Sequence, residues 1–328
     1  MIPANTLQAI QSYTTPANTS LARHLTSHYL SPQIDYLKSH RPISVSMGNA
    51  IRWLKDYIIH IDPDTEEKEA KHDICSAIDT FIRERITVAD TAISGTASSK
   101  VRNGSTVVTF AKSSIVEQSL LRAHSEGKRF KVIVIDSRPL FEGRNLARSL
   151  AASGIETQYM LLSAAGHAIR HADLVLLGAH AMMANGRLYS RVGTASVAML
   201  AHSRDVPVIV CCESIKFTDR VALDSIVQNE IAPPDELLTP TTTPHSVPEI
   251  TDAAKGGGQK GKEADDQESV VDGSLARWRD VLGLQLLNIL FDVTPADFID
   301  MVVTEYGSLP PTSVPVVHRI STERDVRA

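Results

Sequence analysis

Two polar stretches of the sequence each follow a short apolar run and have the composition of an anion-binding site. Ser113 and Ser114 come after the first run, where free backbone N–H groups of a starting helix could hold an anion. Further along, Arg191 precedes Gly193 and Thr194, which open a helix whose N-terminus would suit a phosphate. Helix capping is the plainer interpretation of the first stretch, and connecting turns explain the second equally well.

A third stretch combines carboxylates with arginines directly after an apolar run. Asp136 and Arg138 begin it, and Glu142 and Arg144 complete it within eight residues. Such a set could clamp a ligand, or it could form an ion-pair network where two subunits meet. The spacing does not decide between these two roles.

Two of the three cysteines, Cys211 and Cys212, are interpreted as buried structural thiols. Cys211 and Cys212 end an apolar run, and strand alternation would place them on opposite faces of a sheet. Together with Cys75 they make an odd, small number for 328 residues, which argues against a disulfide scaffold. We therefore expect a reducing compartment, with the cytosol or the nucleus as the default location.

The sequence contains no complete motif for binding a nucleotide cofactor or a metal ion. The run from Gly256 to Lys262 resembles a phosphate-binding loop, but Glu263 stands where the metal-binding hydroxyl belongs. We therefore predict no cofactor and no metal. Two pairs of histidines have the spacing of a shared helix face without a third ligand in a metal-binding pattern: His24 with His28, and His167 with His171.

The predicted secondary structure that must position these residues changes near residue 101, from helices alone to alternating strands and helices. Residues 1–100 have apolar residues at helical spacing and prolines between segments, which predicts a bundle of about four helices. Residues 101–328 alternate apolar runs with helical stretches, which predicts a Rossmann-like, mostly parallel α/β domain that binds ligands at the C-terminal ends of its strands. The expected strands are 106–111, 131–136, 157–162, 174–178, 206–212 and 314–317, and the expected helices are 114–125, 143–153, 193–203, 281–291 and 295–303.

Composition narrows the class of protein further. The formal net charge is -5, so no basic excess indicates nucleic acid as the main partner. The longest apolar run, 206–212, is far too short to span a bilayer, and the first residues lack the pattern of a secretory signal. Residues 239–272 contain no Leu, Met, Phe, Tyr, Trp or Cys and are rich in Gly, Pro and acidic residues. They are predicted to form a disordered insertion within the α/β domain.

Several motifs in a fixed order resemble a known family. They are Asp136-Ser-Arg-Pro, Gly178-Ala-His-Ala, Ser190-Arg-Val-Gly-Thr, Cys211-Cys-Glu and Asp292-Val-Thr-Pro. This series resembles the regulatory subunits of translation initiation factor 2B, and the delta type most. The resemblance covers the chain except residues 239–272. It implies a fold shared with methylthioribose-1-phosphate and ribose-1,5-bisphosphate isomerases.

The resemblance to the isomerases implies a pocket that has lost its catalytic groups. Ala111 stands where the isomerases have a catalytic cysteine, and His180 where they have a catalytic aspartate. Because moving a proton between adjacent carbons needs an acid/base pair, we do not expect an enzyme. An alternative is that the pocket still binds a sugar phosphate. The residues expected to line it are Thr109, Ala111, Lys112, Ser113, His180, Asn185, Arg191, Gly193 and Thr194.

The resemblance also implies partners. In this family the delta-type subunit pairs with a beta-type subunit, and alpha, gamma and epsilon subunits complete a decamer in which epsilon carries guanine-nucleotide exchange. The regulatory core binds translation initiation factor 2 and senses phosphorylation of its alpha subunit, and Arg83, Glu84 and Arg85 are candidates for that surface. Delta-type members carry a long polar N-terminal extension that this sequence lacks, so we expect a truncated chain or a short member. The candidate subunit contacts are Arg138, Glu142, Arg144, Leu286, Ile289 and Val316.

Overall fold

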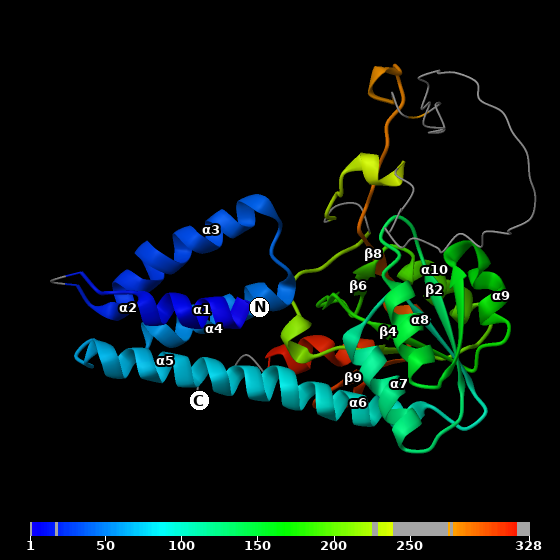
Figure 1. The fold of residues 1–328 in the computed structure, drawn as a ribbon, viewed down its shortest axis with the longest axis horizontal. Helices are drawn as coiled ribbons and strands as arrows, with labels where there is room; N and C mark the ends of the chain where they lie inside the picture. The colour runs from blue at the N-terminus through cyan, green and yellow to red at the C-terminus, as the bar shows by residue number, and fades with distance from the viewer. Residues whose placement is uncertain (1, 17–18, 225–228, 239–274, 276–277, 320–328) are drawn as a thin grey trace, which may run out of the picture. The chain divides into compact units, whose positions relative to one another are not determined.

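The computed structural model describes residues 2–16, 19–224, 229–238, 275 and 278–319 (Figure 1). The predicted insertion at 239–272, and the phosphate-loop-like run within it, lie outside the described residues. The chain divides into two compact units, one formed by residues 1–230 with 290–328 and the other by residues 231–289. In the part of the chain that the structure describes, no helix combines the length and hydropathy needed to cross a membrane.

The N-terminal region consists of helices, as the sequence predicts. Two of them are long and composite, because α-helical and π-helical segments follow one another without a break. The described part of residues 1–100 therefore contains four helical rods, at 2–12, 21–40, 45–59 and 67–100. Their segments are α1 (Ile2–Ser12), α2 (Leu21–His24), η1 (Leu25–Leu30), α3 (Ser31–His40), α4 (Val45–Ile59), α5 (Glu67–Ile82), η2 (Arg83–Val88) and α6 (Ala89–Lys100).

A seven-stranded sheet forms the centre of the α/β region. Its order is β3-β2-β1-β4-β7-β9-β10, and only β10 pairs antiparallel to its neighbour. This is the strand order of a Rossmann-like sheet with an added antiparallel edge, so the predicted fold class is confirmed. The strands are β1 (Thr106–Phe110), β2 (Lys131–Asp136), β3 (Glu156–Leu161), β4 (Leu174–Gly178), β7 (Val208–Cys211), β9 (Met301–Thr304) and β10 (Gly307–Leu309).

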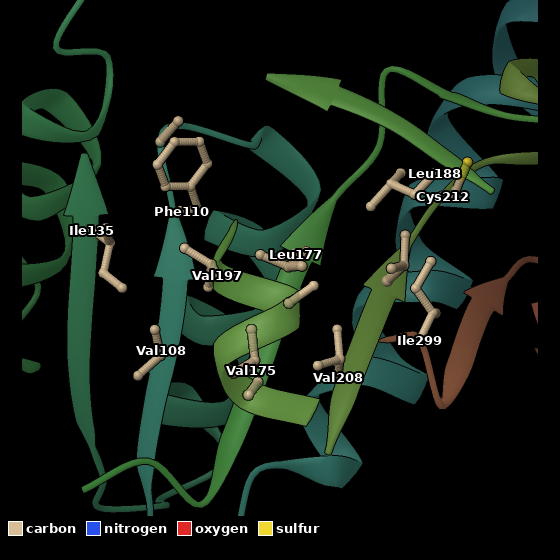
Figure 2. Close-up of a cluster of buried hydrophobic side chains, with 14 of the residues drawn as sticks. Val108, Phe110, Ile135, Val175, Leu177, Leu188, Val197, Val208, Cys212 and Ile299 are labelled. Atoms are coloured by element: carbon tan, nitrogen blue, oxygen red, sulfur yellow. The ribbon is translucent and has the colours of Figure 1, made fainter. Parts of the chain in front are cut away.

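Helices bury both faces of this sheet. On one face α9 (Ala165–Ile169) and α10 (Thr194–His202) cover a core that includes Val108, Val175 and Val208, against which Val197 of α10 packs (Figure 2). On the other face α6, α7 (Ser114–Ser125) and α8 (Gly143–Ala152) cover a core that includes Val107. Because the inner strands β1, β2, β4 and β7 are buried on both sides, their sequences read as nearly continuous apolar runs, which made them predictable.

The prediction was wrong for three segments near the C-terminal end. Residues 281–291 are not helical: the chain is extended after a 3-10 turn at Trp278–Asp280 and enters strand β8 (Phe291–Thr294). Residues 295–303 form a short 3-10 turn, Ala296–Phe298, followed by β9 rather than a helix. Residues 314–317 belong to a helical stretch over 314–319, not to a strand.

The physical reason is that short apolar runs fit either structure until their partners are known. Strand β8 forms because it pairs with β6 (Leu188–Arg191), which in turn pairs with β5 (Ala181–Met182), in a second, antiparallel sheet. Strand β9 forms because it extends the parallel sheet beside β7. In both pairings the partner residues are about 90 or more positions apart in the sequence, so local periodicity gives no sign of them.

Gly193, at the N-terminus of α10, packs closely against side chains of the core. Its φ is +108°, a conformation that favours glycine. A Cβ atom at this position would lie 2.6 Å from Phe110 Cζ and 2.9 Å from Leu162 Cδ2. The glycine therefore allows α10 to begin directly against the end of β1.

Gly193→Ala is expected to destabilise the chain by about 2–4 kcal/mol, since it adds overpacking to left-handed strain. The free energy of unfolding, from denaturant titration, measures this. Gly104→Ala is the matched control, because Gly104 has φ +77° but open space around it, and it should cost about 1 kcal/mol. Equal effects for the two variants would contradict the packing argument.

Candidate functional site

A pocket of about 260 Å³ lies at the C-terminal ends of β1 and β4. From β1 the chain moves to β2 on one side, whereas β4 lies on the other side, so this is the topological switch point of the sheet. Phe110 and Ala111 line the pocket from the end of β1, and Leu177 and Gly178 line it from β4. The pocket thus occupies the position at which such sheets bind ligands.

The structure brings most of the predicted pocket residues together and leaves three aside. Thr109 is fully buried in β1, and its hydroxyl oxygen has no hydrogen-bond partner. Gly193 packs behind the pocket against Phe110. Asn185 lies in the turn between β5 and β6, where its Nδ2 donates to the Ala222 carbonyl oxygen at 2.8 Å. The predicted residues that line the pocket are Ala111, Lys112, Ser113, His180, Arg191 and Thr194.

The loop after β1 packs tightly on the end of β4. A Cβ atom on Gly178 would lie 2.2 Å from the Ser113 Oγ atom, so only glycine permits this contact. Ala111 has a left-handed backbone, with φ 54°, which costs about 1–2 kcal/mol for a residue with a side chain. The turn after β1, from Ala111 to Ser113, is therefore sterically constrained.

Two buried carboxylates hold the helices that flank the pocket. Asp136 at the end of β2 accepts hydrogen bonds from the Arg144 backbone N–H at 3.1 Å and from the Tyr159 hydroxyl at 3.0 Å. Asp292 of β8 accepts from the backbone N–H groups of Gly193 and Ala195, at 2.7 and 3.0 Å. Each carboxylate thus satisfies N–H groups that helix termini leave free.

Burial shifts the ionisation of Asp292. Burial raises the pKa of this carboxyl to about 6, although the hydrogen bonds from the two backbone N–H groups lower it. The Asp292-Val-Thr-Pro motif was identified in the sequence only by resemblance. In the structure its aspartate caps the N-terminus of α10 and so supports the wall of the pocket.

The pocket is lined by cations, each with a carboxylate partner. Arg191 forms a bidentate pair with Glu142, with N···O distances of 2.7 and 2.8 Å. Its third guanidinium nitrogen, Nη1, is buried without a hydrogen-bond partner. Lys216 pairs with Glu213 at 2.7 Å, and Lys112 lies 3.8 Å from Glu117. The arrangement could accept an anion through Arg191 and Lys112 without breaking the tighter pairs.

Sequence reasoning missed two of the cations that line this pocket. Lys216 comes from the 3-10 turn η4 (Ser214–Lys216) after β7, within a motif that the resemblance includes. Arg41 comes from the end of α3, and its Nε donates to Glu230 at 2.7 Å. Nothing in the sequence near Arg41 indicates that the helical region reaches the ends of the strands.

His180 belongs to an aromatic cluster rather than to an acid/base pair. Its ring lies 4.5 Å from the Phe291 ring and 5.6 Å from the Tyr189 ring, between centroids. Burial, together with the nearby charges of Lys216 and Arg191, lowers the pKa of His180 to about 4. The imidazole is therefore neutral at pH 7.

The cysteines behave as the sequence predicts. Cys211 belongs to the core on one face of the sheet and Cys212 to the core on the other. Burial raises the pKa of the Cys211 thiol to about 12 and raises that of Cys212 as well. Neither thiol is poised for nucleophilic chemistry. Among the described residues, no group of three or more His, Cys, Asp or Glu is placed to hold a metal ion.

The candidate contact residues are exposed to different degrees. Arg138 and Arg144 are exposed, and the Arg144 guanidinium lies 4.0 Å from the centre of the Phe141 ring. Glu142 instead turns inward to Arg191. Val316, on the helical stretch 314–319, is 59% exposed. In the smaller unit Leu286 and Ile289 are half-buried, whereas their neighbours Leu282 and Leu287 are exposed.

A second, larger pocket of about 830 Å³ adjoins the first. It is largely apolar and lies between the helical region and the antiparallel sheet, and His180, Arg41 and Phe291 line both pockets. Sequence analysis did not anticipate it, because its walls come from segments that are far apart in the chain. Its apolar walls include Leu30, Ile34, Leu37, Ile43, Met47, Ile51 and Leu54.

His180→Gln is expected to reduce the acid sensitivity of the chain. A folded-state pKa of about 4, below the unfolded value of 6.5, means that stability is complete above pH 6.5 and is lost as pH falls through 4. Between pH 7 and pH 4 the natural chain should lose about 3 kcal/mol more than the variant. Unfolding titrations across this range measure the difference. The exposed His171→Gln is the control, and a variant as acid-sensitive as the natural chain would contradict the assignment.

The comparisons with known proteins agree with this geometry. A profile of the Initiation factor 2 subunit family matches residues 1–311. Translation initiation factor eIF2B subunit delta of Schizosaccharomyces pombe is 43% identical over 94% of this chain and 61% of its own length. The protein of the same name from Dictyostelium discoideum is 37% identical over 95% of this chain and 46% of its own. The chain thus spans roughly half to three fifths of these curated relatives.

Two further similarities concern the fold and the pocket. The tetrameric eIF2B-beta2-delta2 complex from C. thermophilum matches with a TM-score of 0.75 and 34% identity, over 93% of this chain and 83% of the matched chain. The ribose 1,5-bisphosphate isomerase of Archaeoglobus fulgidus is 29% identical over 84% of this chain and 75% of its own length. The resemblance to delta-type subunits, drawn from the motifs, is confirmed. The chain belongs to the initiation factor 2 subunit family.

Proposed function

We propose that the chain is a non-catalytic regulatory subunit, of the delta type, of the guanine-nucleotide exchange complex translation initiation factor 2B. The observation that carries the proposal is the chemistry of the pocket at the ends of β1 and β4. Ala111 and His180 both line it, at the positions that resemble the catalytic cysteine and aspartate of the isomerases. Alanine cannot transfer a proton and the His180 imidazole is neutral at pH 7, so the pocket lacks the acid/base pair of an isomerase.

The proposal includes a set of partners. Similarity to a solved beta2-delta2 tetramer supports a beta-type subunit as the direct partner. Alpha, gamma and epsilon subunits would complete a decamer, with epsilon carrying exchange on the GTPase translation initiation factor 2. The chain would work in the cytosol, and its role needs neither direct contact with nucleic acid nor a membrane.

The helical region would present the surface that meets the GTPase. Arg83 and Glu84 are exposed in the π-helical segment η2, as this role requires. A phosphoserine on the alpha subunit of the GTPase adds roughly two negative charges and favours arginine. Sensing of phosphorylation would then be a change in how the GTPase docks on the regulatory core.

Assembly with a beta-type subunit tests the central claim. Mass measurement of the chain, alone and mixed with a purified beta-type subunit, should show a new species with both subunits. Val316→Glu should weaken this species at least tenfold, because a charge would be buried at an exposed apolar position of the candidate contact. Ile59→Glu, at a position 63% exposed in the helical region, is the control and should assemble normally. A chain that stays a monomer beside its partner would contradict the proposal.

A second candidate function is binding of a sugar phosphate in the same pocket without catalysis. The buried, unpartnered Nη1 of Arg191 and the half-exposed Lys112 favour it. Thermal unfolding with ribose 5-phosphate or inorganic phosphate should then shift to higher temperature, because a ligand of the folded state stabilises that state. Lys112→Met should weaken binding about tenfold, whereas Lys131→Met, at the opposite end of the sheet, should not. No shift with either anion would remove this candidate.

A further inference from the structure

The two adjoining pockets differ in their chemistry. Among the described residues that line the smaller pocket, one carboxylate, that of Glu142, stands beside four cationic side chains, those of Arg41, Lys112, Arg191 and Lys216. The larger pocket, of about 830 Å³, is largely apolar. Its volume lies within the range of small-molecule sites, which is about 300–1,000 Å³. A cationic compartment thus lies directly beside an apolar one.

Two helices of the helical region form the apolar wall of the larger pocket (Figure 1). Each contributes a stripe at the i, i+4 and i+7 positions, which lie on one helix face: Leu30, Ile34 and Leu37 of the rod at 21–40, and Met47, Ile51 and Leu54 of α4. In the part of the chain that the structure describes, Met47 and Ile51 are half-buried and belong to none of the buried cores. Leu37 is 54% exposed. The wall therefore leaves apolar surface in contact with water, which is unfavourable.

Arg41, His180 and Phe291 stand at the junction, because they line both pockets. Arg41 Nε donates to Glu230 at 2.7 Å, and a guanidinium has five N–H donors, so this bond does not exhaust it. The His180 ring packs on the Phe291 ring, with 4.5 Å between the centroids. The junction thus presents a cation and two ring surfaces together.

The charges of the two pockets favour an anion. Cations outnumber carboxylates in the larger pocket as well, where the charged lining residues among those described are Arg41, Lys55, Arg220 and Glu230. In the smaller pocket Lys112 is held only loosely, at 3.8 Å from Glu117. Arg191 Nη1 is buried without a hydrogen-bond partner among the described residues, although the guanidinium also pairs with Glu142. Lys112 and Arg191 could therefore receive an anion while the tighter ion pairs persist.

We propose that the two pockets together bind an amphipathic phosphate monoester. Its phosphate lies among the cations at the ends of β1 and β4, and its aliphatic chain covers the apolar wall formed by the helical region. The chain removes this wall from water, whereas a sugar phosphate in the smaller pocket leaves it exposed. The proposal rests on the second candidate function, because it uses the same cations, and it is independent of assembly with a beta-type subunit.

Isothermal titration calorimetry of the full chain with ethyl phosphate and octyl phosphate tests the proposal, with octyl phosphate kept below its critical micelle concentration. Octyl phosphate should bind at one site per chain and at least tenfold more tightly than ethyl phosphate, because only the longer chain reaches the apolar wall. Octyl glucoside has the same chain without the charge and measures detergent-like binding. It should bind at least tenfold more weakly than octyl phosphate.

Variants of the wall and of the cations locate the two parts of the ligand. Ile51→Gln should weaken octyl phosphate at least fivefold, because it places an amide in the apolar wall. Leu37→Gln, at an exposed position of the same wall, should act in the same direction with little effect on folding. Ile59→Gln is the matched control, since Ile59 lies on the same helix as Ile51 but is 63% exposed and outside the pocket. Lys112→Met should weaken octyl phosphate about tenfold and leave octyl glucoside unchanged.

The proposal is overturned if octyl phosphate binds no more tightly than ethyl phosphate or octyl glucoside. It is also overturned if both Ile51→Gln and Leu37→Gln bind octyl phosphate as the natural chain does. If a protein partner covers the wall instead, the free chain will not prefer octyl phosphate and Ile51→Gln will weaken assembly with the beta-type subunit, which again overturns it. Ribose 5-phosphate is titrated in parallel: binding of this ligand without a preference for octyl phosphate rejects the apolar part of the site and retains the second candidate function.

Discussion

Burial of a parallel sheet on both faces is the constraint on which the rest of the structure depends. The inner strands pair with a neighbour on each side, and helices on both faces exclude water from their side chains. Parallel strands all end at the same edge, so their C-terminal loops must meet there. The reversal of strand order between β1 and β4 leaves a pocket at that edge.

The pocket at the ends of β1 and β4 is bounded by closely packed turns. Tight packing of Gly178 on Ser113, and of Gly193 on Phe110, keeps the shape of the turns. Asp136 and Asp292 hold the helices that flank it. Ala111 and the neutral His180, whose ring packs against Phe291, line this pocket.

The helical region meets the sheet through polar contacts as well as through the core that α6 shares with one face of the sheet. Arg41 donates to Glu230, and Asn49 donates to the carbonyl oxygens of Ile215 and Phe217 in the turn after β7.

The sequence alone determined the strands with two buried faces, because β2 and β4 read as uninterrupted apolar runs and match their predicted bounds. It also determined that residue 111 is an alanine, which has no transferable proton, because this is a matter of residue identity. Only the tertiary structure decided that residues 281–303 supply strands β8 and β9, that Asn185 lies outside the pocket, and that Arg41 and Lys216 line it. These outcomes depend on pairings between distant residues, for which a short apolar run or a single cation carries no local signal.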